Sequence, residues 1–269
     1  MSSAAKTLKL LAHFSVEQPE IGLSQLCRLA GRDKATTYRH LQALEETGLV
    51  EQNLLTKRYR LGPAVLQLAQ TREVTVPRKA GAGAALQALA DATGETAHVS
   101  ILSGTTLYSL DYIESLQHST RVIIDLPTFP LHATASGLCA LAFGPLDLME
   151  FAVANLTKFT PHTATSAQSL EAQVQRARDT GFGRSRGTLE DDVNSLSAPV
   201  FDQTGFFAGT VTVACVATRL TPDLDRTIQT NLVAASRQIS RNWGGSIPPE
   251  VEACWSDALS NPHTLEPSP

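Results

Sequence analysis

The sequence predicts an α+β protein in which an N-terminal winged helix-turn-helix is joined by a helical connector to a larger domain with an antiparallel sheet. Between Gly22 and Leu61, two short helical segments meet at a glycine and are followed by two short alternating segments. Beyond Pro77, apolar strand-like runs alternate with amphipathic helical runs. Charge divides in the same way, because residues 1–70 hold nine Lys/Arg against six Asp/Glu, whereas residues 71–269 hold thirteen against twenty.

The composition limits the class of protein. The chain has 269 residues, 42% of them hydrophobic, which is enough for the cores of one or two domains. No run approaches the roughly 18 apolar residues of a membrane span, and the N-terminus lacks a signal-peptide pattern, so we expect a cytoplasmic protein without a membrane partner. The four cysteines are widely spaced and form no metal-binding motif. We therefore expect reduced thiols, no metal site and no cofactor.

The predicted DNA-binding domain spans residues 1–62. Its first helix is predicted over about residues 4–15, where apolar positions recur at helical spacing. A second helix ends at Gly31, which allows a sharp turn because glycine readily takes a positive φ. A third helix is predicted from about Lys34 to Thr47, and Gly48 ends it.

The third helix has one apolar face and one polar, basic face. Thr37, Leu41 and Leu44 form the seam that we expect to pack inward. On the opposite face, an arginine can form paired hydrogen bonds with guanine, and a small alanine lets the helix enter the major groove. The residues predicted to contact double-stranded operator DNA, including two basic residues of the following hairpin, are Lys34, Ala35, Thr36, Tyr38, Arg39, Gln42, Lys57 and Arg58.

A short hairpin completes the predicted domain. Leu49–Gln52 and Lys57–Leu61 alternate as strands around residues 53–56. Basic residues at its tip can reach backbone phosphates, which positions a protein on DNA without reading sequence. Winged helices also serve as protein-interaction modules, so a ligand-sensing adaptor without DNA binding is the alternative interpretation. Salt-dependent retention on duplex DNA distinguishes the two.

A connector helix is predicted over residues 63–76, with one proline in its first turn and another just after its end. The second domain is predicted to span residues 77–245. Its predicted elements are a helix ending before Gly94, strands at 97–102, 107–113 and 121–126, helices at 135–143, 146–156 and 170–180, strands at 195–201 and 207–216, and a last helix capped by Thr221. The proline-rich tail, residues 246–269, is predicted to be disordered.

A candidate ligand site lies where a proline-bounded loop enters the helix that begins at Ala135. A helix N-terminus presents unpaired N–H groups and a partial positive charge, which suit a carboxylate. The predicted contacts are backbone amides near Ala133, Thr134 and Ala135 and the hydroxyls of Thr134 and Ser136. We expect His98, in a strand, to be a core residue.

No catalytic site is predicted. Ser136, His132 and Asp191 supply the residue types of a Ser/His/Asp set, but the chain has no G-x-S-x-G elbow, H-E-x-x-H, P-loop or Rossmann glycine pattern. We expect His132 to make a structural hydrogen bond. The sequence therefore favours a binding protein over an enzyme.

Five segments resemble, in order and in spacing, the IclR-type bacterial transcriptional regulators. They are residues 22–62, LHATASG at 131–137, Gly181-Phe182, Glu190-Asp191, and SAPVFD at 197–202. The resemblance covers roughly residues 5–245. It implies a DNA-binding domain followed by an effector-binding domain related to the GAF fold. It also implies self-association as a dimer or dimer of dimers and control of catabolic operons by small organic acids.

The chain departs from the family pattern around the implied effector pocket. Ser185 stands where an acidic residue is common, and Ser195 lies in a segment where glycine and cysteine are common. Thr212 and Ala214 stand where two serines are common. We expect these four residues to contact the effector and to alter the size and polarity that fit. The resemblance therefore does not identify the effector, the operator or the sign of regulation. The hypothesis for regulation is that the effector shifts dimer geometry through the helix at 63–75.

Overall fold

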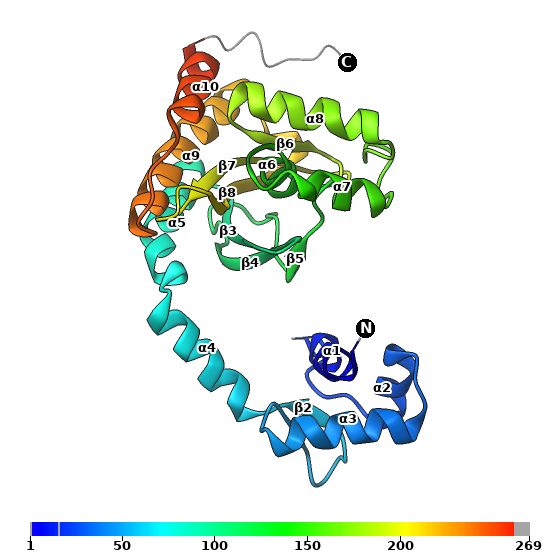
Figure 1. The fold of residues 1–269 in the computed structure, drawn as a ribbon. Coiled ribbons are helices and arrows are strands. Elements are labelled where there is room, and N and C mark those ends of the chain that lie inside the picture. Colours follow the sequence, from blue (N-terminus) through cyan, green and yellow to red (C-terminus); the bar gives the residue numbers. More distant parts are fainter. Residues whose placement is uncertain (1, 16, 261–269) are drawn as a thin grey trace. The chain divides into compact units, whose positions relative to one another are not determined.

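A computed structural model describes residues 2–15 and 17–260, and the chain divides into two compact units at the Pro77–Arg78 bond. Figure 1 shows a small, mostly helical first unit and a second unit built on a sheet with helices on both faces. The α+β class and the antiparallel sheet predicted from the sequence are confirmed. Each unit is described by itself below.

The first unit begins with three helical segments. Helix α1 (Ser3–Leu8) continues into a 3₁₀ turn (Lys9–His13), and α2 (Leu23–Ala30) is followed by α3 (Lys34–Glu46). Gly31 stands between α2 and α3 with φ 63°, a conformation that glycine adopts without steric cost. The predicted turn is confirmed. Helix α2 starts at Leu23 after Gly22, and no side chain caps it.

A two-stranded wing follows. Strands β1 (Val50–Gln52) and β2 (Tyr59–Leu61) are antiparallel, and Tyr59 also exchanges backbone hydrogen bonds with Ile21. This bridge ties the wing to the loop before α2. The buried side chains that make up the core of the unit are Leu10, Ile21, Leu26, Leu41, Leu44, Val50 and Tyr59.

Helix α4 (Pro63–Thr75) begins with a proline at its first position, as predicted. None of its residues is buried within the described chain. Leu66, Leu68 and Val74 are 63%, 61% and 80% exposed. The helix therefore presents apolar side chains that nothing in its own unit covers.

The second unit is organised around a six-stranded antiparallel sheet in the order β5-β4-β3-β8-β7-β6. The strands are β3 (Thr96–Ser103), β4 (Thr106–Ile113), β5 (Thr128–Phe129), β6 (Gly183–Arg186), β7 (Val193–Phe201) and β8 (Phe207–Val216). Helices α5 (Arg78–Thr93) and α9 (Pro222–Asn242) cover one face. The other face carries α6 (Ala135–Phe143), with α7 (Asp147–Ala154) and α8 (Ala167–Thr180) beside it.

The two faces of the central strands differ in chemistry. Side chains alternate across a strand, so Ala97, Val99, Val211 and Val213 pack in the main apolar core. The intervening positions of β3 and β8 hold Thr96, His98, Ser100, Thr210 and Thr212. His98 and Thr212 are cross-strand partners, and Thr212 also pairs with Ser197 of β7. These side chains form a polar row across one face of the sheet. On that face, the Ser136 hydroxyl of α6 bonds both His98 and Thr212.

Two predictions about this unit are wrong. Residues 121–126 are an extended loop and not a strand, because neighbouring strands do not pair with them. The tail was predicted to be disordered from residue 246, but Pro249–Ser260 forms helix α10. Val251, Trp255 and Ala258 share one face of α10 and are buried in the main core, where the indole lies against Phe182 with the two rings tilted. The last part of that prediction, residues 261–269, lies outside the described residues.

Candidate DNA interface and ligand cavity

Helix α3 has a buried face and an exposed face. Thr37, Leu41 and Leu44 are buried, as their spacing predicts. The other face carries most of the residues predicted to contact DNA. Lys34, Ala35, Tyr38, Arg39 and Gln42 are exposed, and Thr36 is half-buried. A helix fixed by its apolar seam and exposing arginine, lysine and tyrosine has the shape and donors to enter a major groove.

The start of α3 is held by its own sequence. The Asp33 carboxylate accepts a hydrogen bond of 2.8 Å from the Thr36 N–H, and that bond lowers the pKa of Asp33. His40 is linked to Thr7 of α1 by a 2.5 Å hydrogen bond. Burial and then the positive charges of Arg32, Arg39 and Lys6 lower the pKa of His40. The surroundings of α3 are therefore electropositive, which favours a polyanion.

The wing tip is also exposed and basic. Lys57 has φ 57°, and both Lys57 and Arg58 are exposed. The Asn53 side chain shapes the turn, because its oxygen accepts hydrogen bonds from the Leu55 and Thr56 N–H groups. Both predicted phosphate contacts thus lie on a structured turn at the end of the wing.

The second unit contains a cavity of about 60 Å³, room for a few water molecules or a small organic molecule. It lies between the start of α6 and strands β3, β7 and β8. Residues expected from the sequence that line it are Ala133, Thr134, Ala135, Ser136, Ser185, Ser195 and Ala214. Thr212 does not line it and lies behind Ser136. Lining residues that sequence reasoning did not assign to the site are His98, Phe129, Leu189, Glu190, Val193 and residues 122–126.

The start of α6 keeps two donors free. The Thr134 hydroxyl accepts from the Gly137 N–H at 2.9 Å and donates to the Pro130 carbonyl, so it caps the helix and is not available to a ligand. Within the described chain, the N–H groups of Ala135 and Ser136 have no hydrogen-bond partner. No lysine or arginine lines this cavity among the residues described. An anion here would depend on these two N–H groups.

A glycine sets how closely α6 approaches the sheet. A Cβ on Gly183 of β6 would stand 2.2 Å from the Ala135 carbonyl oxygen and 2.8 Å from the Cys139 Cβ. Only glycine fits without displacing the first turn of α6. Next to it, the Ser185 hydroxyl bonds Thr188, whose own hydroxyl donates to the Ala133 carbonyl at 2.7 Å. These contacts fix the first turn of α6, which carries the free N–H groups.

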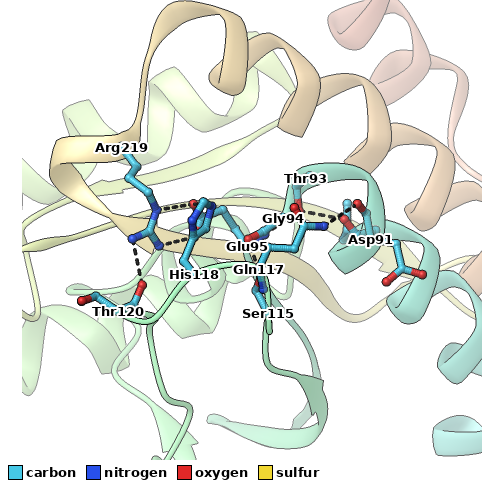
Figure 2. A network of polar contacts seen from close by, with 10 residues as sticks. Asp91, Thr93, Gly94, Glu95, Ser115, Gln117, His118, Thr120 and Arg219 are labelled. Atoms are coloured by element: carbon cyan, nitrogen blue, oxygen red, sulfur yellow. Dashed lines mark hydrogen bonds and ion pairs between the residues drawn. The ribbon is translucent and has the colours of Figure 1, made fainter.

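One wall of the cavity is a loop, residues 114–127, anchored by the polar network in Figure 2. Glu95 is 1% exposed and accepts two hydrogen bonds of 2.6 Å from Arg219, which also donates to the Thr120 carbonyl at 2.8 Å. The Ser115 hydroxyl donates to the Gly94 carbonyl, and the Gln117 amide donates to the Asp91 carbonyl. The segment 122–126 that lines the cavity is thereby tied to the end of α5 and the start of β3.

The Ser/His/Asp set considered from the sequence is not assembled. The Ser136 hydroxyl bonds His98 and Thr212, whereas the His132 ring bonds the backbone of Thr157. The structural role expected for His132 is confirmed. Burial strongly raises the pKa of the Cys139 thiol, which keeps it protonated. Over the described ranges, no cluster of three or more His, Cys, Asp or Glu side chains could hold a metal ion, and no helix is long and apolar enough to cross a membrane.

Two family models match the chain. The model described as "IclR helix-turn-helix domain" covers residues 3–54, and the one described as "Bacterial transcriptional regulator IclR C-terminal" covers residues 76–241. The glycerol operon regulatory protein of Streptomyces griseus is 29% identical over 248 residues, which are 91% of this chain and 96% of that protein.

Solved structures of IclR-type proteins also resemble the chain. A structure described as an IclR transcriptional regulator from Silicibacter sp. TM1040 superposes with a TM-score of 0.85 and 39% identity, covering 93% of this chain and 99% of that one. An IclR homologue from Microbacterium hydrocarbonoxydans, solved with 4-hydroxybenzoate, has a TM-score of 0.75 at 19% identity, covering 90% and 99%. The second likeness concerns the fold alone.

Proposed function

The chain belongs to the IclR family of bacterial transcriptional regulators, and from that premise we propose that it binds the operator of a catabolic operon under the control of a small organic acid. Its function as a DNA-binding regulator follows from both family models and the regulator relatives. The operon class, the acid and the residue contacts are our proposal, and the proposal places the protein in the cytoplasm.

The exposed face of α3 carries the DNA-binding part of the proposal. We assign base-edge contacts to Arg39 and Gln42, which project from the side opposite the buried Leu41. Lys34, Lys57 and Arg58 are assigned to phosphates, which set the position of the helix. The proposed footprint also includes Ala35, Thr36 and Tyr38.

We further propose that the protein self-associates. Helix α4 exposes Leu66, Leu68 and Val74 and buries no side chain in its own unit. A second copy of the same helix offers a matching apolar surface, as symmetric dimers commonly do. A dimer places two copies of α3 on one DNA molecule, which suits a palindromic site.

The cavity carries the effector part of the proposal. The free N–H groups of Ala135 and Ser136 donate hydrogen bonds to a carboxylate at the N-terminus of α6. Phe129, Ser195 and Ala214 supply the surrounding surface. The relative solved with 4-hydroxybenzoate supports a small carboxylic acid as the class of ligand. Within the described residues, Ser136 bonds His98 and Thr212 whereas His132 bonds the backbone of Thr157, and the regulator relatives support binding over turnover.

Selection from a pool of random duplex DNA tests the proposed function. The full-length protein is expected to enrich one roughly palindromic sequence, and its affinity for that site is expected to fall steeply between 50 and 200 mM salt. Enrichment of no sequence, together with salt-independent retention, would support the protein-binding adaptor instead.

A further inference from the structure

A histidine that lines the cavity has a buried hydrogen-bonding atom that the fold leaves unused. His98 is 4% exposed, lines the cavity from β3 and stacks on Phe129 with ring centroids 4.7 Å apart. Its Nδ1 has no hydrogen-bond partner. Among the side chains described, the only other buried polar atom without a hydrogen-bond partner is Oε1 of Gln173. Buried polar atoms in folded proteins are nearly always paired, so an unpaired one on a side chain that lines the cavity calls for an explanation.

The hydrogen-bond row behind His98 fixes where its proton lies. The Ser197 hydroxyl donates to the Val211 carbonyl at 3.3 Å. The Thr212 hydroxyl donates to Ser197 at 2.8 Å, which uses its one proton. Ser136, 2.8 Å from Thr212, must therefore be the donor in that contact. Every hydroxyl of the row then points its proton away from the histidine.

The consequence for His98 is a defined tautomer. Its Nε2 lies 3.1 Å from the Ser136 oxygen, whose own proton is already committed, so Nε2 carries the hydrogen and donates it. Burial lowers the pKa of His98 to about 3, so the ring is neutral and holds a single N–H. Nδ1 is thus a bare acceptor. The same tautomer prevents His98 from acting as a base toward Ser136.

We propose that the effector donates a hydroxyl hydrogen to Nδ1 of His98, so that the site selects carboxylic acids that also bear a hydroxyl group over their oxo, methoxy or unsubstituted counterparts. The inference rests on the proposed binding of a carboxylate at α6. The two ends of the ligand are assigned to neighbouring groups, since the imidazole that would accept the hydroxyl bonds Ser136, and the proposal assigns the Ser136 N–H to the carboxylate. A keto oxygen offers Nδ1 only a second acceptor, which leaves both atoms unpaired.

The tautomer is tested without any ligand. In full-length protein labelled with ¹⁵N-histidine, long-range ¹H–¹⁵N correlations are expected to show a protonated Nε2 and an unprotonated Nδ1 for His98 at neutral pH. The signal is assigned by its loss in His98→Gln. A protonated Nδ1, or a charged ring, overturns the proposal before any effector is known.

Ligand selectivity is tested with matched acid pairs by calorimetry: mandelate with phenylglyoxylate, lactate with pyruvate, and 4-hydroxybenzoate with 4-methoxybenzoate. In the pairs that bind, the hydroxylated member is expected to bind at least about tenfold more tightly. His98→Asn keeps an acceptor near the place of Nδ1 and is expected to keep this ratio. His98→Gln keeps a donor toward Ser136 but no such acceptor, and its ratio is expected to fall below about threefold.

The outcomes separate the two proposals. Equal affinities within each pair, in a protein whose operator binding still responds to the acids, would refute the role of His98 and leave the regulator intact. The same holds if His98→Asn and His98→Gln lose the ratio equally, because the ring would then act only through packing. Absence of any acid effect on operator binding would count against the cavity itself as the effector site.

Discussion

Arg219 holds the carboxylate of Glu95 through two hydrogen bonds of 2.6 Å, and Glu95 is almost completely buried. The same guanidinium reaches the Thr120 carbonyl in the loop that walls the cavity (Figure 2). The 3₁₀ turn Ala217–Arg219, which precedes α9, is therefore linked to the cavity wall through an arginine that also pairs with a buried carboxylate. Burial together with this pairing makes the contact sensitive to loss of either partner.

Removing Arg219 is expected to destabilise the second unit. Arg219→Ala leaves the Glu95 carboxylate buried without its arginine partner and with only His118 nearby, 3.9 Å from its Oε1, at a cost on the order of 3 kcal/mol in the free energy of unfolding. Chemical denaturation followed by circular dichroism measures it. Arg237→Ala breaks a solvent-exposed pair with Glu252 and is the control, expected to cost about 1 kcal/mol or less. Equal losses of unfolding free energy in the two variants would show that the Arg219–Glu95 pair stabilises the fold no more than an exposed pair does.

Arg39→Ala is expected to weaken specific operator binding by roughly 1–3 kcal/mol, because a bidentate contact with a base edge is lost. Fluorescence anisotropy with the selected duplex and with a scrambled one measures the specific part. Arg176→Ala removes an exposed arginine of α8 and should leave both affinities as they are. If Arg39→Ala and Arg176→Ala have the same affinity for the selected duplex, the exposed face of α3 is not the surface that recognises the DNA sequence.

Charges on α4 are expected to weaken self-association. Leu66→Asp combined with Leu68→Asp places two carboxylates on the apolar surface proposed to meet a second copy. Sedimentation velocity over a concentration series should show a shift toward monomer. Gln168→Asp adds a carboxylate at an exposed polar position of α8, outside the proposed surface, and should leave the mass unchanged. A double variant with the mass of the native assembly would place the interface elsewhere.

Because His98 is buried, we expect the protein to lose stability in mild acid. Its folded pKa is about 3, below the usual value near 6.5, so between these values the unfolded chain binds a proton that the folded chain does not. Stability should therefore fall as pH drops below 6.5, by about 1.4 kcal/mol per pH unit from this group. His98→Gln lacks the titrating ring, so its free energy of unfolding should vary less between pH 6.5 and 4. Parallel curves for the two proteins would mean that His98 titrates normally.

The sequence predicts elements best where local signals agree. Helix α6 and strand β8 have the predicted bounds, and Gly205 in the turn before β8 has a positive φ of 75°. Helix α9 begins at Pro222 with the Thr221 cap that was predicted. In each of these, a cap or turn residue coincides with the start or end of an apolar pattern.

The errors arise where pairing in space decides the outcome. Residues 121–126 have strand-like composition but lie beside the cavity without a strand partner. Helix α10 was missed because prolines dominated the interpretation of the tail, although Val251, Trp255 and Ala258 recur at helical spacing. His98 is buried as expected, yet its alternation with Thr96 and Ser100 already indicates a polar sheet face. Which polar atoms of that face remain unpaired depends on long-range contacts with α6.

Operator affinity measured with and without a bound acid, in the native protein and in Ala214→Leu, tests the central claim most directly. Ala214 lines the cavity, so a leucine there fills the space proposed for the effector. The native protein is expected to change its operator affinity about 5–150-fold when the acid binds, and Ala214→Leu is expected to bind the operator without responding. Ser195→Leu narrows the same space from β7 and serves as an independent variant. An undiminished response in both folded variants would contradict the claim that an acid in this cavity controls DNA binding by α3.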